Sequence, residues 1–186
     1  MILLVGLGNP TPNSNDNRHN VGFKIIDAIN QKFGLSKQKP KFKGLLTTGT
    51  IANKKVYAIK PLTFMNNSGI CIRELMEYFK IDIDDVIVFH DDLDVDFGKI
   101  KAKFGGSSAG HNGIESIDKF IGKEYSRVRV GIGKPDKKIS VSDYVLNNFN
   151  DEEKTQLDQI TINIIDSIPI LIDKKLDLFS STVNNK

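Results

Sequence analysis

Short apolar runs alternate with amphipathic segments along most of the chain. The runs 2–5 and 86–89 are wholly apolar, which is typical of strands covered on both faces. Between them, Val21, Ile25 and Ile29 recur four residues apart, as on one face of a helix. Strands that alternate with helices predict an α/β protein, and we expect a single-domain sandwich in which helices flank a twisted, mixed β-sheet.

A period of two predicts further strands. Segments 45–52 and 56–59 are expected to form a hairpin. Segments 99–104 and 127–132 alternate between apolar and cationic residues, as half-exposed strands do. A last helix begins at about Asp151 and is ended or kinked by Pro169. We expect one domain over 1–186, with a frayed polar tail over about 180–186.

Composition limits the class of protein and the cellular compartment. Hydrophobic residues make up 39% of the 186 residues and charged residues 26%, as in an ordinary soluble protein, and no apolar run approaches the length of a membrane span. We expect neither a signal peptide nor a membrane partner. Cys71 is the single cysteine, so an intramolecular disulfide is impossible and a reducing cytoplasm is the simple inference. The net charge of +3 is too small to indicate a nucleic-acid partner on its own.

The first strand leads into a loop that carries two candidate functional residues. Asn9 follows the strand directly, and His19 lies just before the helix, where the helix dipole helps to keep an imidazole neutral. Asn20 is a candidate N-cap of that helix. A dinucleotide-binding fingerprint is rejected, because Thr11 stands where the third glycine belongs and two prolines interrupt the turn. A neutral, positioned imidazole is a potential general base.

An acidic stretch follows the buried strand 86–89. Its aspartates begin like a calcium-binding loop, but the glycine comes late, at Gly98, and Lys103 stands where the bidentate glutamate is needed. We therefore reject a calcium-binding loop and expect no cofactor, with a nonspecific metal site as a minor alternative. Asp91 is the first carboxylate beyond the buried run, so it is placed to reach a neighbouring strand end.

The glycine-rich segment 105–113 nearly matches two other motifs. His111 and Asn112 replace the lysine and hydroxyl residue of a phosphate-binding loop. Residues 106–110 satisfy G-x-S-x-G, but the hydrolase fold needs an aspartate and then a histidine later in the chain. His111 is the last histidine, so that order cannot be met. What remains is a donor-rich loop that leads into a helix.

These polar segments all follow predicted strands. The carboxyl ends of strands in open α/β sheets border the crevice where ligands bind, so we expect Asn9, residues 64–66, Asp91 and Asn112 to converge there, with His19 beside them. One basic group, one acid to orient it and several neutral amides are the inventory of a general-base hydrolase that acts on a polar substrate.

The same residues carry a resemblance to a known family. The chain resembles bacterial-type peptidyl-tRNA hydrolases through six ordered motifs: Gly6-Leu7-Gly8-Asn9-Pro10, Arg18-His19-Asn20, Thr63-Phe64-Met65-Asn66, His90-Asp91-Asp92-Leu93-Asp94, Gly110-His111-Asn112-Gly113 and Arg129-Val130-Gly131-Ile132-Gly133. The resemblance implies a monomeric, metal-free esterase that releases peptides from peptidyl-tRNA and so recycles the tRNA for translation.

The resemblance also implies roles for individual residues. His19 corresponds to the catalytic base, Asp91 to the residue that stabilises its active form, and Asn9 to the residue that helps distinguish N-blocked from free aminoacyl esters. The positions that correspond to substrate binding are Ser14, Phe64, Met65, Asn66 and Asn112, and those that correspond to contacts with tRNA phosphate are Lys103 and Arg129.

The chain departs from the family pattern in its loops. Thr11 stands where the family usually has glycine, Ser14 where it usually has a tyrosine that takes part in substrate binding, and residues 107–109 are a variant loop. These departures concern loop conformation and affinity more than the reaction.

Two other functions compete with the esterase. One is a serine hydrolase that uses His19, Asp91 and Ser108 in that chain order. The other is a noncatalytic RNA-binding module, which would keep the basic segments but has no use for a paired histidine and aspartate.

Overall fold

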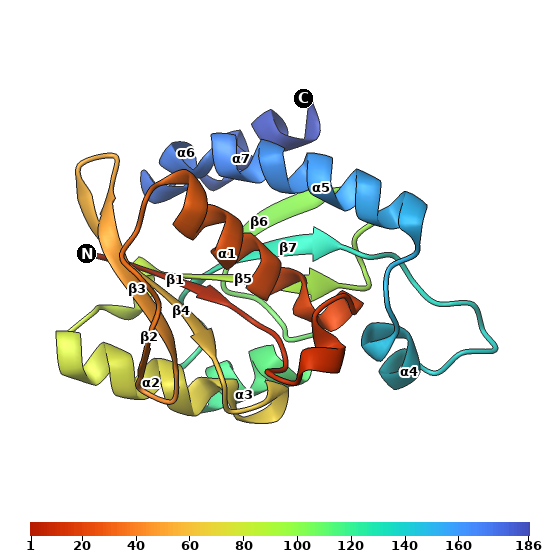
Figure 1. The fold of residues 1–186 in the computed structure, drawn as a ribbon, viewed down its shortest axis with the longest axis horizontal. Coiled ribbons are helices and arrows are strands. Elements are labelled where there is room, and N and C mark those ends of the chain that lie inside the picture. Colours follow the sequence, from red (N-terminus) through yellow and green to blue (C-terminus); the bar gives the residue numbers. More distant parts are fainter.

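A seven-stranded mixed sheet runs through the molecule (Figure 1), in the order β2-β3-β4-β1-β5-β7-β6. The structure is a computed structural model that describes all residues, 1–186. The strands are β1 (Ile2–Gly6), β2 (Lys39–Lys41), β3 (Gly44–Ile51), β4 (Lys54–Pro61), β5 (Val86–Asp92), β6 (Ile100–Phe104) and β7 (Ser126–Gly131). The predicted fold class is confirmed: helices flank a mixed sheet.

The central strands are parallel, and the edges are antiparallel. β1 pairs in parallel with β4 and β5, and β5 pairs in parallel with β7. The predicted hairpin is confirmed as the antiparallel pair β3–β4, and β6 runs antiparallel to β7. The carboxyl ends of β1, β4, β5 and β7 therefore meet at one edge of the sheet, which is where the candidate residues follow.

Helices cover both faces of the sheet (Figure 1). Their bounds are α1 (Val21–Lys32), α2 (Ser68–Phe79), α3 (Asn112–Ile121), α4 (Val141–Leu146), α5 (Asp151–Asp166), α6 (Ile168–Ile172) and α7 (Leu176–Asn184). Alternate residues of β1 enter different cores: Ile2 and Leu4 pack with α1 and α5 to α7, and Leu3 and Val5 with α2 and α3. None of the helices combines the length and apolar composition that a membrane span requires.

Helix α1 lies unusually close to the first strand because two glycines face each other. A Cβ atom on Gly6 would stand 2.2 Å from the carbonyl oxygen of Gly22, and one on Gly22 would stand 2.4 Å from the amide nitrogen of Leu7. This close approach holds the 3-10 turn 18–20, which leads directly into α1, against β5. His19 is thereby delivered to the carboxyl edge of the sheet.

The last helix corrects the prediction of a frayed tail. Instead of fraying from residue 180, the chain forms α7 as far as Asn184, with Phe179 and Val183 buried. The Asn184 side chain accepts from the Ile100 amide and donates to the Ile100 carbonyl, both at 2.9 Å, and Ser180 Oγ accepts from the Ala102 amide at 2.8 Å. The tail is helical because it satisfies the backbone groups of edge strand β6, a constraint that its polar composition does not reveal.

Candidate active site

A cleft of about 740 Å³ opens at the carboxyl edge of the sheet. Its walls come from the loops after β1, β4 and β5, from residues 108–112 and from α4. The sequence-predicted residues that line it are Asn9, Ser14, His19, Phe64, Met65, Asn66, Asp91 and Asn112. Segments that are far apart in the chain thus meet in one cavity at the strand ends, whereas Lys103 and Arg129 lie outside it.

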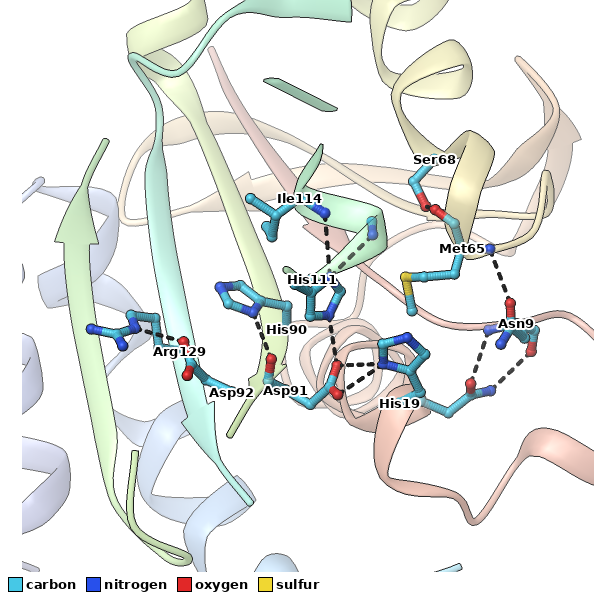
Figure 2. Close-up of polar contacts among 12 residues, drawn as sticks. Asn9, His19, Met65, Ser68, His90, Asp91, Asp92, His111, Ile114 and Arg129 are labelled. Carbon is cyan, nitrogen blue, oxygen red and sulfur yellow. Dashed lines mark hydrogen bonds and ion pairs between the residues drawn. The ribbon is translucent and has the colours of Figure 1, made fainter. Parts of the chain in front are cut away.

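Asp91 is the centre of a hydrogen-bonded group at the floor of the cleft (Figure 2). His19 Nδ1 lies 2.8 Å from Asp91 Oδ2 and 3.0 Å from Oδ1, and His111 Nε2 lies 2.9 Å from Oδ1. The three side chains are almost enclosed, with exposed fractions of 9% for each histidine and 2% for the aspartate. The aspartate therefore holds both imidazoles in place.

The ionisation of Asp91 decides which ring nitrogens carry protons. Burial alone would raise the pKa of Asp91, but the charges and hydrogen bonds of His19 and His111 outweigh burial and hold this pKa below its usual range. An ionised carboxylate only accepts hydrogen bonds, so His19 Nδ1 and His111 Nε2 must both donate. The neutral His19 ring therefore keeps an unprotonated Nε2, which can act as a base.

His111 is a site residue that the sequence analysis missed. Its Nδ1 accepts from the amides of Gly113, at 3.1 Å, and Ile114, at 3.3 Å, so His111 is the N-cap of α3. The signal was its place directly before an amphipathic helix, at a position where acceptors are favoured. One imidazole thus caps a helix with one nitrogen and anchors Asp91 with the other.

The same tautomer argues against a metal at this group. Ligand atoms of His19, Asp91 and His111 lie within 4.8 Å of one another, which is close enough for a shared ion. A ligating histidine must offer a lone pair to the ion. Because Nδ1 of His111 already accepts two amides, its Nε2 carries the ring proton and has no lone pair to offer. The residues fit a hydrogen-bonded group and not a ligand set.

Asn9 is fixed by three hydrogen bonds. Its backbone amide donates to Asn20 Oδ1 and its carbonyl accepts from Asn20 Nδ2, both at 2.9 Å, while Asn9 Oδ1 accepts from the Met65 amide at 2.9 Å. Asn20 is the N-cap residue of α1, as predicted, but its side chain forms no cap bond with the helix and instead pairs with the backbone of Asn9. The amide NH₂ group of Asn9 remains available to donate into the cleft (Figure 2).

Apolar side chains form the side walls of the cleft. Phe64 is 53% exposed and has φ 65°, a left-handed conformation that is rare outside glycine, and Met65 beneath it is buried. On the α4 side, Val141, Val145 and Leu146 line the cavity. These three residues were not predicted from the sequence, because a short amphipathic segment carries no signal of what it faces.

His90 packs behind the hydrogen-bonded group. Its Nδ1 donates to the carbonyl of Asp91 at 2.7 Å, and its ring centroid lies 5.0 Å from that of His111. Burial, and then the charge of His111, lower the pKa of His90 from 6.5 to about 4. His90 is therefore neutral at ordinary pH and supports the Asp91 backbone as a hydrogen-bond donor.

The predicted phosphate-binding cations lie outside the cleft, on β6 and β7. Lys103 is exposed and forms no ion pair, whereas Arg129 Nε donates to Asp92 Oδ2 at 2.7 Å (Figure 2). Burial would raise the pKa of Asp92, but the hydrogen bond from Arg129 lowers it below the usual value. Arg129 thus has a carboxylate partner that the sequence analysis did not anticipate.

The geometry does not support a serine nucleophile. Ser108 Oγ donates to Glu115 Oε1 at 3.4 Å and contacts no histidine, and the Asp91 carboxylate lies between His19 and His111. The loop is held from behind, where buried Arg127 donates to the carbonyl of Ser107 at 3.0 Å. A serine hydrolase needs its hydroxyl within hydrogen-bond reach of the base.

Fold and site together define an α/β protein with a histidine–carboxylate pair in a cleft at the carboxyl edge of its sheet. The chain belongs to the peptidyl-tRNA hydrolase family, whose family model, described as "Peptidyl-tRNA hydrolase", matches residues 3–186. This confirms the resemblance inferred from the motifs.

Individual relatives agree along the whole length. The chain is 78% identical to the peptidyl-tRNA hydrolase of Pelagibacter ubique (strain HTCC1062) over 186 residues, 100% of both chains. It is 44% identical to that of Ehrlichia canis (strain Jake) over 183 residues, 98% of this chain and 94% of the relative. A crystal structure of peptidyl-tRNA hydrolase from Acinetobacter baumannii superposes with a TM-score of 0.92 at 32% identity, covering 99% of this chain and 94% of that chain.

Proposed function

We propose that this protein is an esterase that hydrolyses the ester bond of N-blocked peptidyl-tRNA and releases the peptide and free tRNA. The observation that carries the proposal is the His19–Asp91 pair, which leaves a basic Nε2 on His19 in a cleft large enough for an extended polar substrate. Membership of the peptidyl-tRNA hydrolase family supplies the substrate class.

The reaction is a general-base hydrolysis. His19 Nε2 takes a proton from a water molecule as the water oxygen attacks the ester carbonyl carbon. The tetrahedral intermediate collapses by breaking the bond to the ribose oxygen, which leaves with the proton that His19 had taken. Asp91 stabilises the imidazolium in between, and His111 keeps Asp91 in position. The peptide gains a carboxyl group and the tRNA regains its hydroxyl.

Asn9 provides the selectivity for blocked substrates. Its free NH₂ group donates to a carbonyl oxygen that an N-blocked ester has beyond the reacting carbonyl and a free aminoacyl ester lacks. Met65 holds the amide in the orientation needed for this contact. The other residues proposed to bind substrate around the cleft are Ser14, Phe64, Met65, Asn66 and Asn112.

Lys103 and Arg129 are proposed to meet tRNA phosphate next to the cleft. They lie on the antiparallel pair β6–β7, where Lys103 faces Arg127 and Lys101 faces Arg129 across the ladder. Lys103 is the free cation of the pair, whereas Arg129 binds phosphate only by sharing or leaving Asp92.

The protein is proposed to act as a single-domain monomer in the cytoplasm, without a cofactor. A reducing compartment agrees with the free thiol of Cys71, which lies on α2 and is buried in the core. Burial raises the pKa of the Cys71 thiol to about 12, so the thiol stays protonated and has no catalytic use.

The decisive test compares two substrates. Purified protein is incubated with N-acetyl-aminoacyl-tRNA and with the same aminoacyl-tRNA unblocked, and release of the acyl group is measured for each. We expect rapid release from the blocked ester and little from the free one. Absence of release from the blocked substrate would overturn the assignment, and equal release from both would remove the proposed role of Asn9.

A further inference from the structure

The Arg18 side chain joins segments that lie more than a hundred residues apart. Its Nη1 donates to the carbonyl oxygens of Tyr144, at 3.2 Å, and Asn147, at 3.3 Å, and its Nη2 to Glu153 Oε1 at 3.1 Å. The guanidinium carbon lies 4.1 Å from the centre of the Tyr144 ring and 5.6 Å from that of Phe149. Only 11% of the side chain is exposed. A cation this enclosed has a definite structural task.

The backbone around Arg18 also binds residues 147–149, which directly follow α4. The Arg18 amide donates to the carbonyl of Asn147, and the Phe149 amide donates to the carbonyl of Asp16, both at 3.1 Å. Asn17 and Asn148 form an antiparallel bridge. The C-terminal end of α4 is therefore attached, by main chain and side chain, to the residue that directly precedes His19.

Helix α4 has few other attachments. It has only six residues, so its own hydrogen bonds do little to stabilise it. Its other anchors are the buried Val145 and the Tyr144 hydroxyl, which donates to the carbonyl of Ile132 at 2.6 Å. Val141 and Leu146 line the cleft and yet are 52% and 49% exposed. An exposed apolar wall beside the base suits the apolar part of a substrate.

We propose that Arg18 is a positioning residue, which holds the α4 wall at a fixed distance from His19 and so sets how the enzyme recognises the acyl part of its substrate. The inference rests on the proposed esterase function. Arg18 touches no reacting atom; it acts through Val141 and Leu146 on α4.

The chemistry of the contacts requires arginine. A planar guanidinium offers several donors in a fixed fork, so it can serve two carbonyl oxygens and a carboxylate while stacking on an aromatic ring. The carbonyls it meets lie at the C-terminal end of α4, where the helix dipole is negative. Glu153 is itself oriented, since its Oε1 also accepts from the Asn150 amide in the capping box of α5. Lysine, with one compact ammonium group, cannot reproduce these contacts.

The test compares acyl groups of different size. KM and kcat are measured for N-acetyl-glycyl-tRNA and N-acetyl-phenylalanyl-tRNA with wild type, Arg18→Ala and Arg18→Lys, and each variant is expressed relative to wild type so that tRNA identity cancels. The control is Lys24→Ala, which removes the exposed Lys24–Asp16 pair on the same segment. We expect Arg18→Ala to raise KM for the phenylalanyl ester about tenfold more than for the glycyl ester, as loss of one charged hydrogen bond would, with little change in kcat.

A purely structural role has a different signature. It lowers thermal stability and the active fraction, so kcat falls by the same factor for both substrates while KM stays constant, and this result would overturn the proposal. If Arg18→Ala does not fold, Arg18→Lys and Glu153→Gln, which keep most of the volume, carry the same comparison of substrates.

A double-mutant cycle tests the route through α4. Leu146→Ala shortens the wall directly, so its effect on KM for the phenylalanyl ester should not add to that of Arg18→Lys. Full additivity, or an unchanged KM in Leu146→Ala, would show that α4 is not the element through which Arg18 acts. A wild-type protein that hydrolyses neither ester contradicts the proposed function itself, so the two failures are distinguishable.

Discussion

Two neighbouring regions are built in opposite ways: the histidine corner of the cleft, formed by His19, Asp91 and His111, and the cationic edge on β6 and β7, with Lys103 and Arg129. In the corner, Asp91 is almost completely buried and is held by two histidines and a backbone support from His90. On the edge, Lys103 is exposed and unpaired, and Arg129 is shared with Asp92. One region has fixed geometry and low exposure; the other has charge and little constraint.

The difference separates chemistry from affinity. A proton transfer needs the base in one tautomer and one orientation, which enclosed hydrogen bonds provide. Attraction to a polyanion needs only positive charge near the surface, and salt screens it over a Debye length of about 8 Å at physiological ionic strength. Substitutions in the corner should therefore change turnover, and substitutions on the edge should change salt-dependent binding.

The largest effect is expected for His19→Ala, which removes the base. Loss of a general base costs roughly a hundredfold to ten-thousandfold in rate. The measurement is kcat on N-acetyl-aminoacyl-tRNA, with circular dichroism to show that the fold is intact. Near-normal turnover by the folded variant would end the assignment of the corner as the reaction centre.

Asp91→Asn should have the next largest effect, on the order of a hundredfold in kcat with substrate binding retained. The amide can no longer stabilise the imidazolium or require a proton on His19 Nδ1. The matched control is Asp94→Asn, an exposed carboxylate that lines the same cleft. Equal losses in both variants, or an unchanged pH profile in Asp91→Asn, would remove the special role of the buried carboxylate.

His90 gives the corner a measurable pH signature. Because burial and His111 depress its pKa from 6.5 to about 4, the unfolded chain binds more protons between these values. Stability from this group is therefore present above pH 6.5 and lost as the pH falls towards 4, with a slope of at most about 1.4 kcal/mol per pH unit. The free energy of unfolding is measured in urea at several pH values. For His90→Gln, which keeps a donor but does not titrate, the slope of this free energy against pH should be flatter than for wild type. Lys103→Ala should keep the wild-type slope, and matching slopes in all three proteins would contradict the assignment.

The edge should respond through salt dependence. If each cation meets one phosphate, Lys103→Ala and Arg129→Ala each reduce the slope of log affinity against log salt by about 0.7 to 0.9. Lys39→Ala, on exposed strand β2 at the opposite edge of the sheet, is the matched control. A slope that is the same in the edge variants and the control would demote Lys103 and Arg129 to solvated surface.

The smallest effect is expected on the loop that runs between the two regions. Ser108→Ala should keep most of the activity, because the Ser108 hydroxyl contacts Glu115 and no histidine. A fluorophosphonate probe should neither label nor inhibit the protein. Stoichiometric labelling of Ser108 with loss of turnover would replace the water mechanism by a covalent one.

Local pattern was enough to predict the alternation of strands and helices, the β3–β4 hairpin and the gathering of Asn9, Phe64 and Asp91 at one edge of the sheet. These predictions hold because periodicity reports which face of an element is buried, and parallel strands carry their carboxyl ends to a common edge. His19 also followed from position alone, since it precedes an amphipathic helix after a buried strand.

Partner choice depended on three-dimensional packing. Asp91 meets His19 from 72 residues away and His111 from 20. Arg129 pairs with Asp92, and the Asn20 side chain pairs with Asn9 and forms no cap bond with α1. Each of these polar groups had several partners available along the chain. Its actual partner depends on the close approach of Gly6 and Gly22, on the strand order and on loops that pack against distant elements. The reason is that a buried polar group must form its hydrogen bonds with the neighbours that packing brings to it.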